Sequence, residues 1–172
     1  MTEILRDWHD FYVLMGTAAA TLIGLMFVAA SIGAGLFTDD HKDMMKTFLT
    51  PTIVHFCSIL FICLSVTVPS LSLTTLSGLW ALASVIGVAY SCGVWVRIRR
   101  RYGSATNFVD QLWYAPIPIA GYLVLAAAAL VSLTRSLILL DFLALGISLL
   151  LLAGIRNAWA MTLWIAIQPK RD

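Results

Sequence analysis

Three polar side chains share one face of an apolar segment between residues 51 and 69. His55, Ser58 and Ser65 lie within about 80° of one another at 100° per residue of a helix. In lipid, such groups must face protein or water. A histidine ordinarily titrates at about pH 6.5, so this face predicts the lining of a path for a small solute or ion, with His55 as a gate or proton relay. The alternative is structural: the serines bond back to backbone carbonyls, and His55 meets a neighbouring helix.

Ionisable side chains also occur in the apolar segment 137–167. Asp141, Ser148 and Arg156 lie on one broad face of a helix there. Asp141 and Arg156 are about 22 Å apart along the helix, so they cannot pair with each other. Because charges at membrane depth are costly, these residues are candidates for the two mouths of a path. Alternatively, they are interfacial anchors whose charged ends reach water.

Patterns typical of membrane enzymes are absent from the sequence. There is no H-E-x-x-H, no C-x-x-C-H and no glycine-rich phosphate loop, and the predicted spans contain no carboxylate pair at helical spacing for metal binding. His9, His41 and His55 fall at different expected depths, which disfavours a haem held by two histidines. We therefore expect neither an enzyme active site nor a metal or other cofactor.

Composition determines the elements that must hold these residues. The chain is 60% hydrophobic and 12% charged, whereas soluble domains carry about 25% charged residues. Apolar runs of about 20 residues predict membrane-spanning helices. We expect an all-α bundle forming a single transmembrane domain over residues 1–172, with lipids as its surroundings. The net charge of +2 gives no indication of nucleic acid binding. The predicted spans are 11–37, 51–69, 75–96, 112–133 and 137–167.

Two of these spans have distinctive ends. Thr50 and Pro51 predict the start of the second helix, as an N-cap residue followed by proline at the first helical position. The fifth span, 137–167, is about 46 Å long, whereas a hydrocarbon core is about 30 Å thick. It must therefore tilt, bend or project from the membrane.

The distribution of Lys and Arg predicts the orientation, because cytoplasmic loops retain positive charge. With five spans, one side holds only Arg6 and Arg135. The other side holds Lys42, Lys46, Arg97, Arg99, Arg100, Arg101, Lys170 and Arg171. This asymmetry places the N-terminus outside and the C-terminus in the cytoplasm.

Small residues form smooth faces on the first and third spans, where another helix can approach closely. The first face comprises Gly16, Ala20, Gly24, Ser31 and Gly35. The second comprises Ala83, Gly87 and Ser91. Each face is expected to pack either inside one protomer or between copies.

A cluster of four arginines follows the third span. It comprises Arg97, Arg99, Arg100 and Arg101. These residues are expected to fix the topology, and they are also suited to contact anionic lipid or an acidic partner.

Several segments resemble a widespread group of small bacterial inner-membrane proteins. The resemblance is carried by residues 8–12 (WHDFY), 16–20 (GTAAA) and 22–29 (LIGLMFVA). It continues in the arginine cluster and in residues 156–159 (RNAW). The resemblance implies a multi-pass protein of the bacterial inner membrane with a Gly/Ala-rich first helix.

Two classes of function are consistent with these features. The first is a homo-oligomeric channel or conduit for a small solute or ion, because five helices are too few to enclose a wide path alone. The second is a regulatory subunit without transport activity, which binds a membrane protein partner. The polar residues in the spans favour the first class.

The charge distribution predicts that residues 69–77 face the periplasm and residues 97–111 face the cytoplasm. In a variant without the native cysteines, Ser104→Cys should resist an impermeant thiol reagent applied to intact spheroplasts, whereas Ser72→Cys should react. Rapid labelling at residue 104 would overturn this orientation.

Overall fold

The computed structural model describes residues 2–33, 39–68, 70–102, 108–134 and 136–167, and this part of the chain is helical without strands. Five of its helices are long and apolar enough to cross a membrane, so the expected all-α bundle with five candidate spans is confirmed. The helices are α1 (Thr2–Gly33), α2 (Asp39–Thr67), α3 (Leu73–Tyr102), α4 (Phe108–Tyr114), α5 (Pro116–Ser132) and α6 (Ile138–Ile167).

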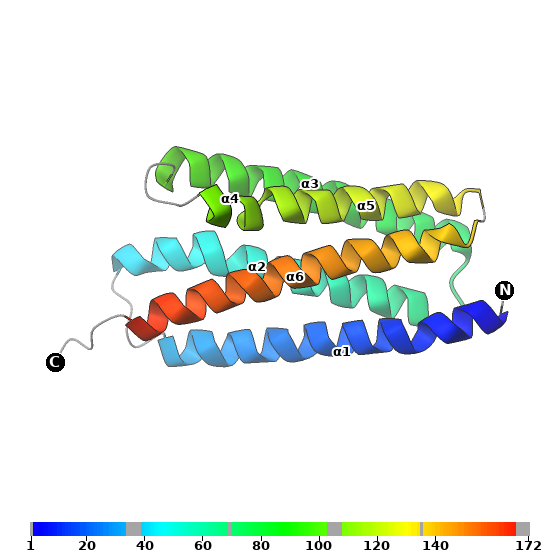
Figure 1. Ribbon diagram of the computed structural model, residues 1–172, viewed down its shortest axis with the longest axis horizontal. Coiled ribbons are helices and arrows are strands. Elements are labelled where there is room, and N and C mark those ends of the chain that lie inside the picture. Colours follow the sequence, from blue (N-terminus) through cyan, green and yellow to red (C-terminus); the bar gives the residue numbers. More distant parts are fainter. Residues whose placement is uncertain (1, 34–38, 69, 103–107, 135, 168–172) are drawn as a thin grey trace.

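The long helices run along a common axis (Figure 1). α5 packs between α3 and α6, while α2 contacts α1, α3 and α6. α1 packs mainly against α2 and lies at one edge of the bundle, away from α3 and α5 (Figure 1). We call the end at which α3 finishes and α4 lies the arginine end, and the end at which α1 begins the N-terminal end.

α2 begins twelve residues before the predicted position. Pro51 lies inside the helix, which starts at Asp39, so the prediction that Thr50 and Pro51 open the helix is wrong. A proline removes one backbone N–H from a helix, and membrane helices tolerate this loss where neighbouring groups satisfy the freed carbonyl. Residues 34–37, at the end of the first predicted span, lie outside the described part of the chain.

The fourth predicted span is divided into α4 and α5. Ala115, between them, has φ −138° and ψ −60°, which interrupts the helix immediately before Pro116. A residue that precedes proline is sterically disfavoured in the helical region, whereas proline itself is favoured in the first helical turn. The predicted span 112–133 thus corresponds to the candidate span Gln111–Ser132, within which a short helix is followed by a new one.

Glycines bring the central helices into close contact. A Cβ added to Gly121 of α5 would lie 3.3 Å from the carbonyl oxygen of Gly146, and one added to Gly146 of α6 would lie 3.1 Å from that of Gly121. Elsewhere, the ring of Tyr122 occupies the space beside Gly87, and the ring of Phe56 the space beside Gly154. Helix contact in this bundle thus depends on backbone approach and on aromatic rings seated against glycines.

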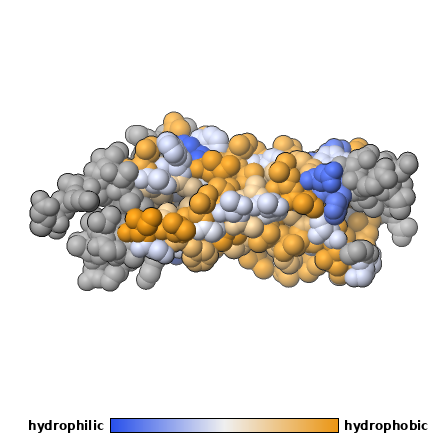
Figure 2. Space-filling model, turned by 90° about the horizontal axis from the view of Figure 1, so that it is seen from below, coloured by the Kyte–Doolittle hydropathy of each residue, from blue (hydrophilic) through white to orange (hydrophobic). Residues whose placement is uncertain are grey.

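Large apolar side chains fill the bundle and also cover much of its outside. Figure 2 shows mainly hydrophobic residues along the visible face. Exposed leucines, isoleucines and valines on every long helix are the expected surface of a protein surrounded by lipid. The fully buried core includes Phe56, Ile59, Ile62, Tyr122, Leu125, Leu143, Ile147 and Leu150.

The glycine crossing between α5 and α6 predicts a strong effect of one added methyl group. Gly146→Ala places a Cβ 2.7 Å from Cδ2 of Leu125, so it should destabilise the protein by about 1–3 kcal/mol, the usual cost of overpacking. The measurement is the melting temperature in detergent. Gly78→Ala is the control, because no atom lies within 4 Å of its added Cβ and alanine favours a helix. Equal melting temperatures for the two variants would contradict a tight crossing.

Candidate functional site

A hydrogen-bonded cluster of three side chains lies in the bundle core between α2 and α5. The hydroxyl of Tyr122 is 3.0 Å from Nδ1 of His55 and 3.0 Å from Oγ of Ser58. The Ser58 hydroxyl also donates to the carbonyl of Val54 at 2.9 Å. His55 is fully buried, and its ring centroid is 5.7 Å from that of Tyr122. We name His55, Ser58 and Tyr122 the histidine cluster.

The number of protons available determines the direction of each bond in the histidine cluster. Ser58 has one hydroxyl proton, so all three hydrogen bonds can form at once only if Ser58 donates to the Val54 carbonyl and the Tyr122 hydroxyl donates to Ser58. The tyrosine proton is then no longer available for His55, so Nδ1 of His55 must carry a proton and donate to the tyrosine oxygen. In the neutral imidazole, Nε2 is therefore a bare acceptor.

Glycines on neighbouring helices position the histidine cluster. Gly121 packs against α6, and Tyr122 follows it on α5 with its ring seated against Gly87 of α3. Phe56, which follows His55, is seated against Gly154 of α6 in the same way. Since α3 and α6 thereby hold the rings of Tyr122 and Phe56, the imidazole is placed by packing as well as by its hydrogen bond.

Three buried polar atoms in the described part of the chain have no hydrogen-bond partner. They are Nε2 of His55, Oγ of Ser91 and Oδ1 of Asn157. Ser91 lies one turn beyond Gly87 toward the arginine end, and Asn157 lies one turn beyond Gly154 in the same direction. The amide nitrogen of Asn157 donates to the Trp113 carbonyl of α4 at 3.2 Å. Unsatisfied groups therefore occur on α2, α3 and α6, in the half of the bundle nearer the arginine end.

Ser65 does not join His55 and Ser58. Its hydroxyl donates to the carbonyl of Ile62 at 2.7 Å and accepts from Nε1 of Trp80 at 2.9 Å. Nearer the N-terminal end, the hydroxyls of Ser77 and Ser132 bond to each other. The expected continuous stripe is thus divided into one cluster around the histidine and separate serine contacts toward the N-terminal end.

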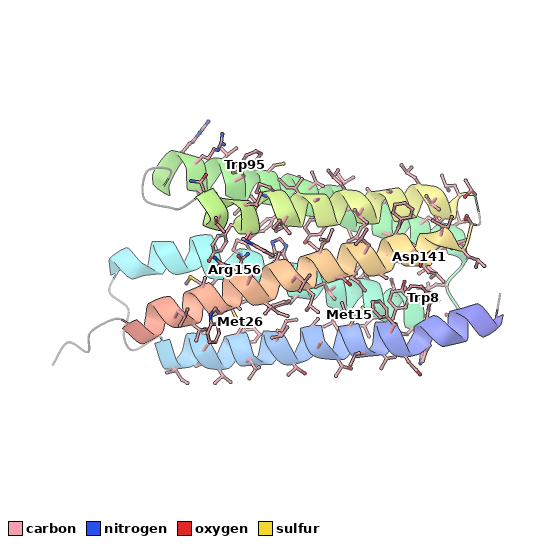
Figure 3. The ribbon with its side chains drawn as sticks, viewed as in Figure 1. Trp8, Met15, Met26, Trp95, Asp141 and Arg156 are labelled. Carbon is pink, nitrogen blue, oxygen red and sulfur yellow. The ribbon has the colours of Figure 1, made fainter. Side chains whose placement is uncertain are left out.

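The ionisable residues of α6 lie far apart, as expected from their spacing. Figure 3 shows Asp141 with Trp8 toward the N-terminal end, and Arg156 with Trp95 toward the arginine end. Asp141 is exposed, whereas Ser148 and Arg156 are half-buried. These three residues therefore do not form one site, and Arg156 lies on the same half of the bundle as the histidine cluster.

The small-residue face of α1 meets a neighbouring helix at one position. A Cβ on Gly16 would lie 3.1 Å from that of Cys63 in α2, but one on Gly24 would meet no atom within 4 Å. Ala20 and Ser31 are exposed, and the Ser31 hydroxyl donates to the carbonyl of Phe27. The expected contact through this face is therefore limited to Gly16 within one protomer. Gly35 lies outside the described residues.

Exposed hydroxyls extend this outward surface of α1. Thr17 donates to the carbonyl of Val13, and Thr21 donates to that of Thr17, each at 2.8 Å. Both side chains are exposed. We name the outward surface formed by Thr17, Ala20, Thr21, Gly24 and Ser31 the smooth face of α1.

The corresponding face of α3 is turned inward. Gly87 and Ser91 are buried, and Ala83 is half-buried. Beyond them, Arg97, Arg99 and Arg100 are exposed at the arginine end. The guanidinium carbon of Arg99 lies 5.0 Å from the ring centroid of Trp95. The side chain of Arg101 is outside the described set.

Within the described residues, no group of three or more His, Cys, Asp or Glu side chains is close enough to hold a metal ion. A comparison of the chain with protein-family models, curated proteins and solved structures finds no match.

Tyr122 is the central residue that sequence reasoning missed. It is separated from His55 by 67 positions, and no periodicity within one helix reveals such a contact. One signal was available: Tyr122 is the only residue between Pro116 and Val131 whose side chain can form a hydrogen bond. In an apolar helix, such a hydroxyl is expected to form a hydrogen bond with a polar group on another helix.

The proton assignment predicts an uncommon tautomer of His55. In nanodiscs, ¹⁵N NMR should show a protonated Nδ1 and an unprotonated Nε2, with the signal assigned by its loss in His55→Gln. Ser58→Ala releases the tyrosine proton to donate to Nδ1, so the population with a protonated Nε2 should increase. A wild-type spectrum with the proton on Nε2, or one that Ser58→Ala leaves unchanged, would contradict the assignment.

Proposed function

We propose that the protein is a homo-oligomeric membrane conduit for a small solute or ion, with His55 controlling passage. The supporting observation is the bare Nε2 of a fully buried imidazole, held from its other nitrogen by Tyr122. A polar atom without a partner is costly inside a membrane protein, which makes it a functional candidate. Such an atom can accept a proton or a hydrogen bond from a polar solute that reaches it.

The packing of one protomer favours a path that involves more than one copy. Toward the N-terminal end, the core beside the histidine cluster is filled by apolar side chains such as Ile59, Leu125 and Ile147. The smooth face of α1 supplies a surface on which copies can associate closely, because its small side chains allow backbones to approach.

We further propose that the conduit lies in the inner membrane of a bacterium, with the N-terminus outside. The arrangement of described charges supports this orientation. Asp10 and Asp141 lie toward the N-terminal end, whereas Arg97, Arg99 and Arg100 are exposed at the other. Positive charge is retained on the cytoplasmic side of membrane proteins.

A second candidate is a regulatory subunit that binds another membrane protein. The open space beside Gly24 favours it, because a foreign helix can dock there as readily as a second copy. The two candidates differ in the mass of the purified protein. A closed, uniform oligomer is expected for the conduit, and a monomer for the subunit.

The conduit is tested by mass measurement in nanodiscs together with flux into liposomes. We expect a uniform oligomer, with flux that decreases about tenfold in His55→Gln, equivalent to raising the barrier by about 1.4 kcal/mol. His9→Gln is the matched control, because His9 is exposed near the N-terminal end and should leave flux unchanged. Asp141→Asn and Arg156→Gln should alter ion selectivity if they lie near the mouths of the path.

Two results would contradict this proposal. A uniform oligomer whose liposomes pass neither ions nor small solutes would exclude a conduit. A monomer that binds a defined membrane protein, with the binding lost in Gly24→Leu, would instead establish the regulatory subunit.

A further inference from the structure

The last turns of α3 combine an aromatic ring with exposed cationic groups. Arg99 folds back over Trp95, one turn earlier, with its guanidinium carbon 5.0 Å from the ring centroid. Arg99 and Arg100 are exposed, and Trp95 is half-buried. A guanidinium stacked on an indole gains a cation–π interaction through its flat face. Its N–H groups, which lie along the edge, remain directed away from the ring.

The position of Trp95 along α3 places this pair at the membrane surface. Trp95 follows Leu73, the first residue of α3, by about 33 Å at the helical rise, and a hydrocarbon core is about 30 Å thick. Tryptophan prefers this boundary. Because Arg99 turns back toward Trp95, its charge lies at the level of lipid headgroups instead of extending into water.

The charge around this pair favours an anionic ligand. Arg100 adds a second exposed cation beside Arg99. A planar guanidinium matches a phosphate group through two parallel N–H···O bonds, so the pair is suited to a phosphate.

The surface below the two arginines is suited to a hydrocarbon chain. Ala89, Cys92 and Val96 are exposed along one face of α3, at helical spacings of three and four residues, and Val96 precedes Arg99 by three residues and Arg100 by four. A phosphate site at one end of an apolar track, running toward the membrane centre, is the arrangement that a phospholipid requires.

We propose that Arg99, Arg100 and Trp95 bind the headgroup phosphate of an anionic phospholipid, with an acyl chain lying along Ala89, Cys92 and Val96. Trp95 positions the guanidinium of Arg99, and the two arginines contact the phosphate. A membrane-surface arginine contributes about 1 kcal/mol to attraction of anionic lipid. This site is separate from the histidine cluster and does not depend on transport.

Native mass spectrometry of protein in mixed phosphatidylglycerol and phosphatidylcholine tests the proposal. Wild type should retain phosphatidylglycerol preferentially, and Arg99→Gln should weaken that retention about fivefold, the change that corresponds to about 1 kcal/mol. Trp95→Leu should also weaken it. Arg99→Lys should recover only part of the retention, because the charge is kept but the planar donor group is lost.

Arg97→Gln is the matched control, since it removes the same charge two residues away, on the side of α3 opposite Trp95 and Arg99. It should retain more phosphatidylglycerol than Arg99→Gln. Equal losses in the two variants would show general electrostatic attraction and overturn the site. Absence of a preference for phosphatidylglycerol over phosphatidylcholine in wild type would overturn it as well, and unchanged retention in Ala89→Leu would remove the acyl track.

Discussion

The contact between Gly121 of α5 and Gly146 of α6 is the constraint from which the candidate site follows. Lipid offers helices no hydrophobic gain on association, so contact depends on close backbone approach and good packing. Because Gly121 packs against α6, the side chain of the next residue, Tyr122, is directed toward α2 and α3. Gly87 leaves space for its ring, and the hydroxyl then reaches His55. A side chain at any of these glycines would displace the tyrosine from its partner.

The histidine cluster also shows why similar residues on one helix have different roles. Ser58 and Ser65 lie on the same face of α2, and both donate to backbone carbonyls, as serines in apolar helices commonly do. What separates them is the group that approaches from another helix. The Tyr122 hydroxyl donates one hydrogen bond to Ser58 and accepts another from His55, which determines the tautomer of the imidazole. The Trp80 indole can only donate. Thus Ser58 is coupled to a titratable group and Ser65 is not.

Composition and apolar run length were sufficient to predict an all-α bundle with five candidate spans, because the membrane requires long apolar helices. They were not sufficient at Pro51 and Ala115, where tolerance of a proline depends on its surroundings. The polar face of α2 was found from periodicity, which identifies a face but not what lies opposite it. The role of Tyr122 required knowledge of which helices are neighbours. Gly24 and Gly87 likewise have similar sequence contexts, yet one is open and the other receives a ring.

The two outermost helices present different surfaces to the membrane. α1 and α3 lie on opposite edges of the bundle (Figure 1). The smooth face of α1 has small side chains whose hydroxyls are bonded to their own helix, so it can be covered by another helix without leaving polar groups unpaired. The outward face of α3 ends in exposed arginines, which a second helix would have to desolvate at considerable cost. Association of copies is therefore favoured along α1, while α3 remains directed toward lipid, so that both proposed contacts can be made by one protomer.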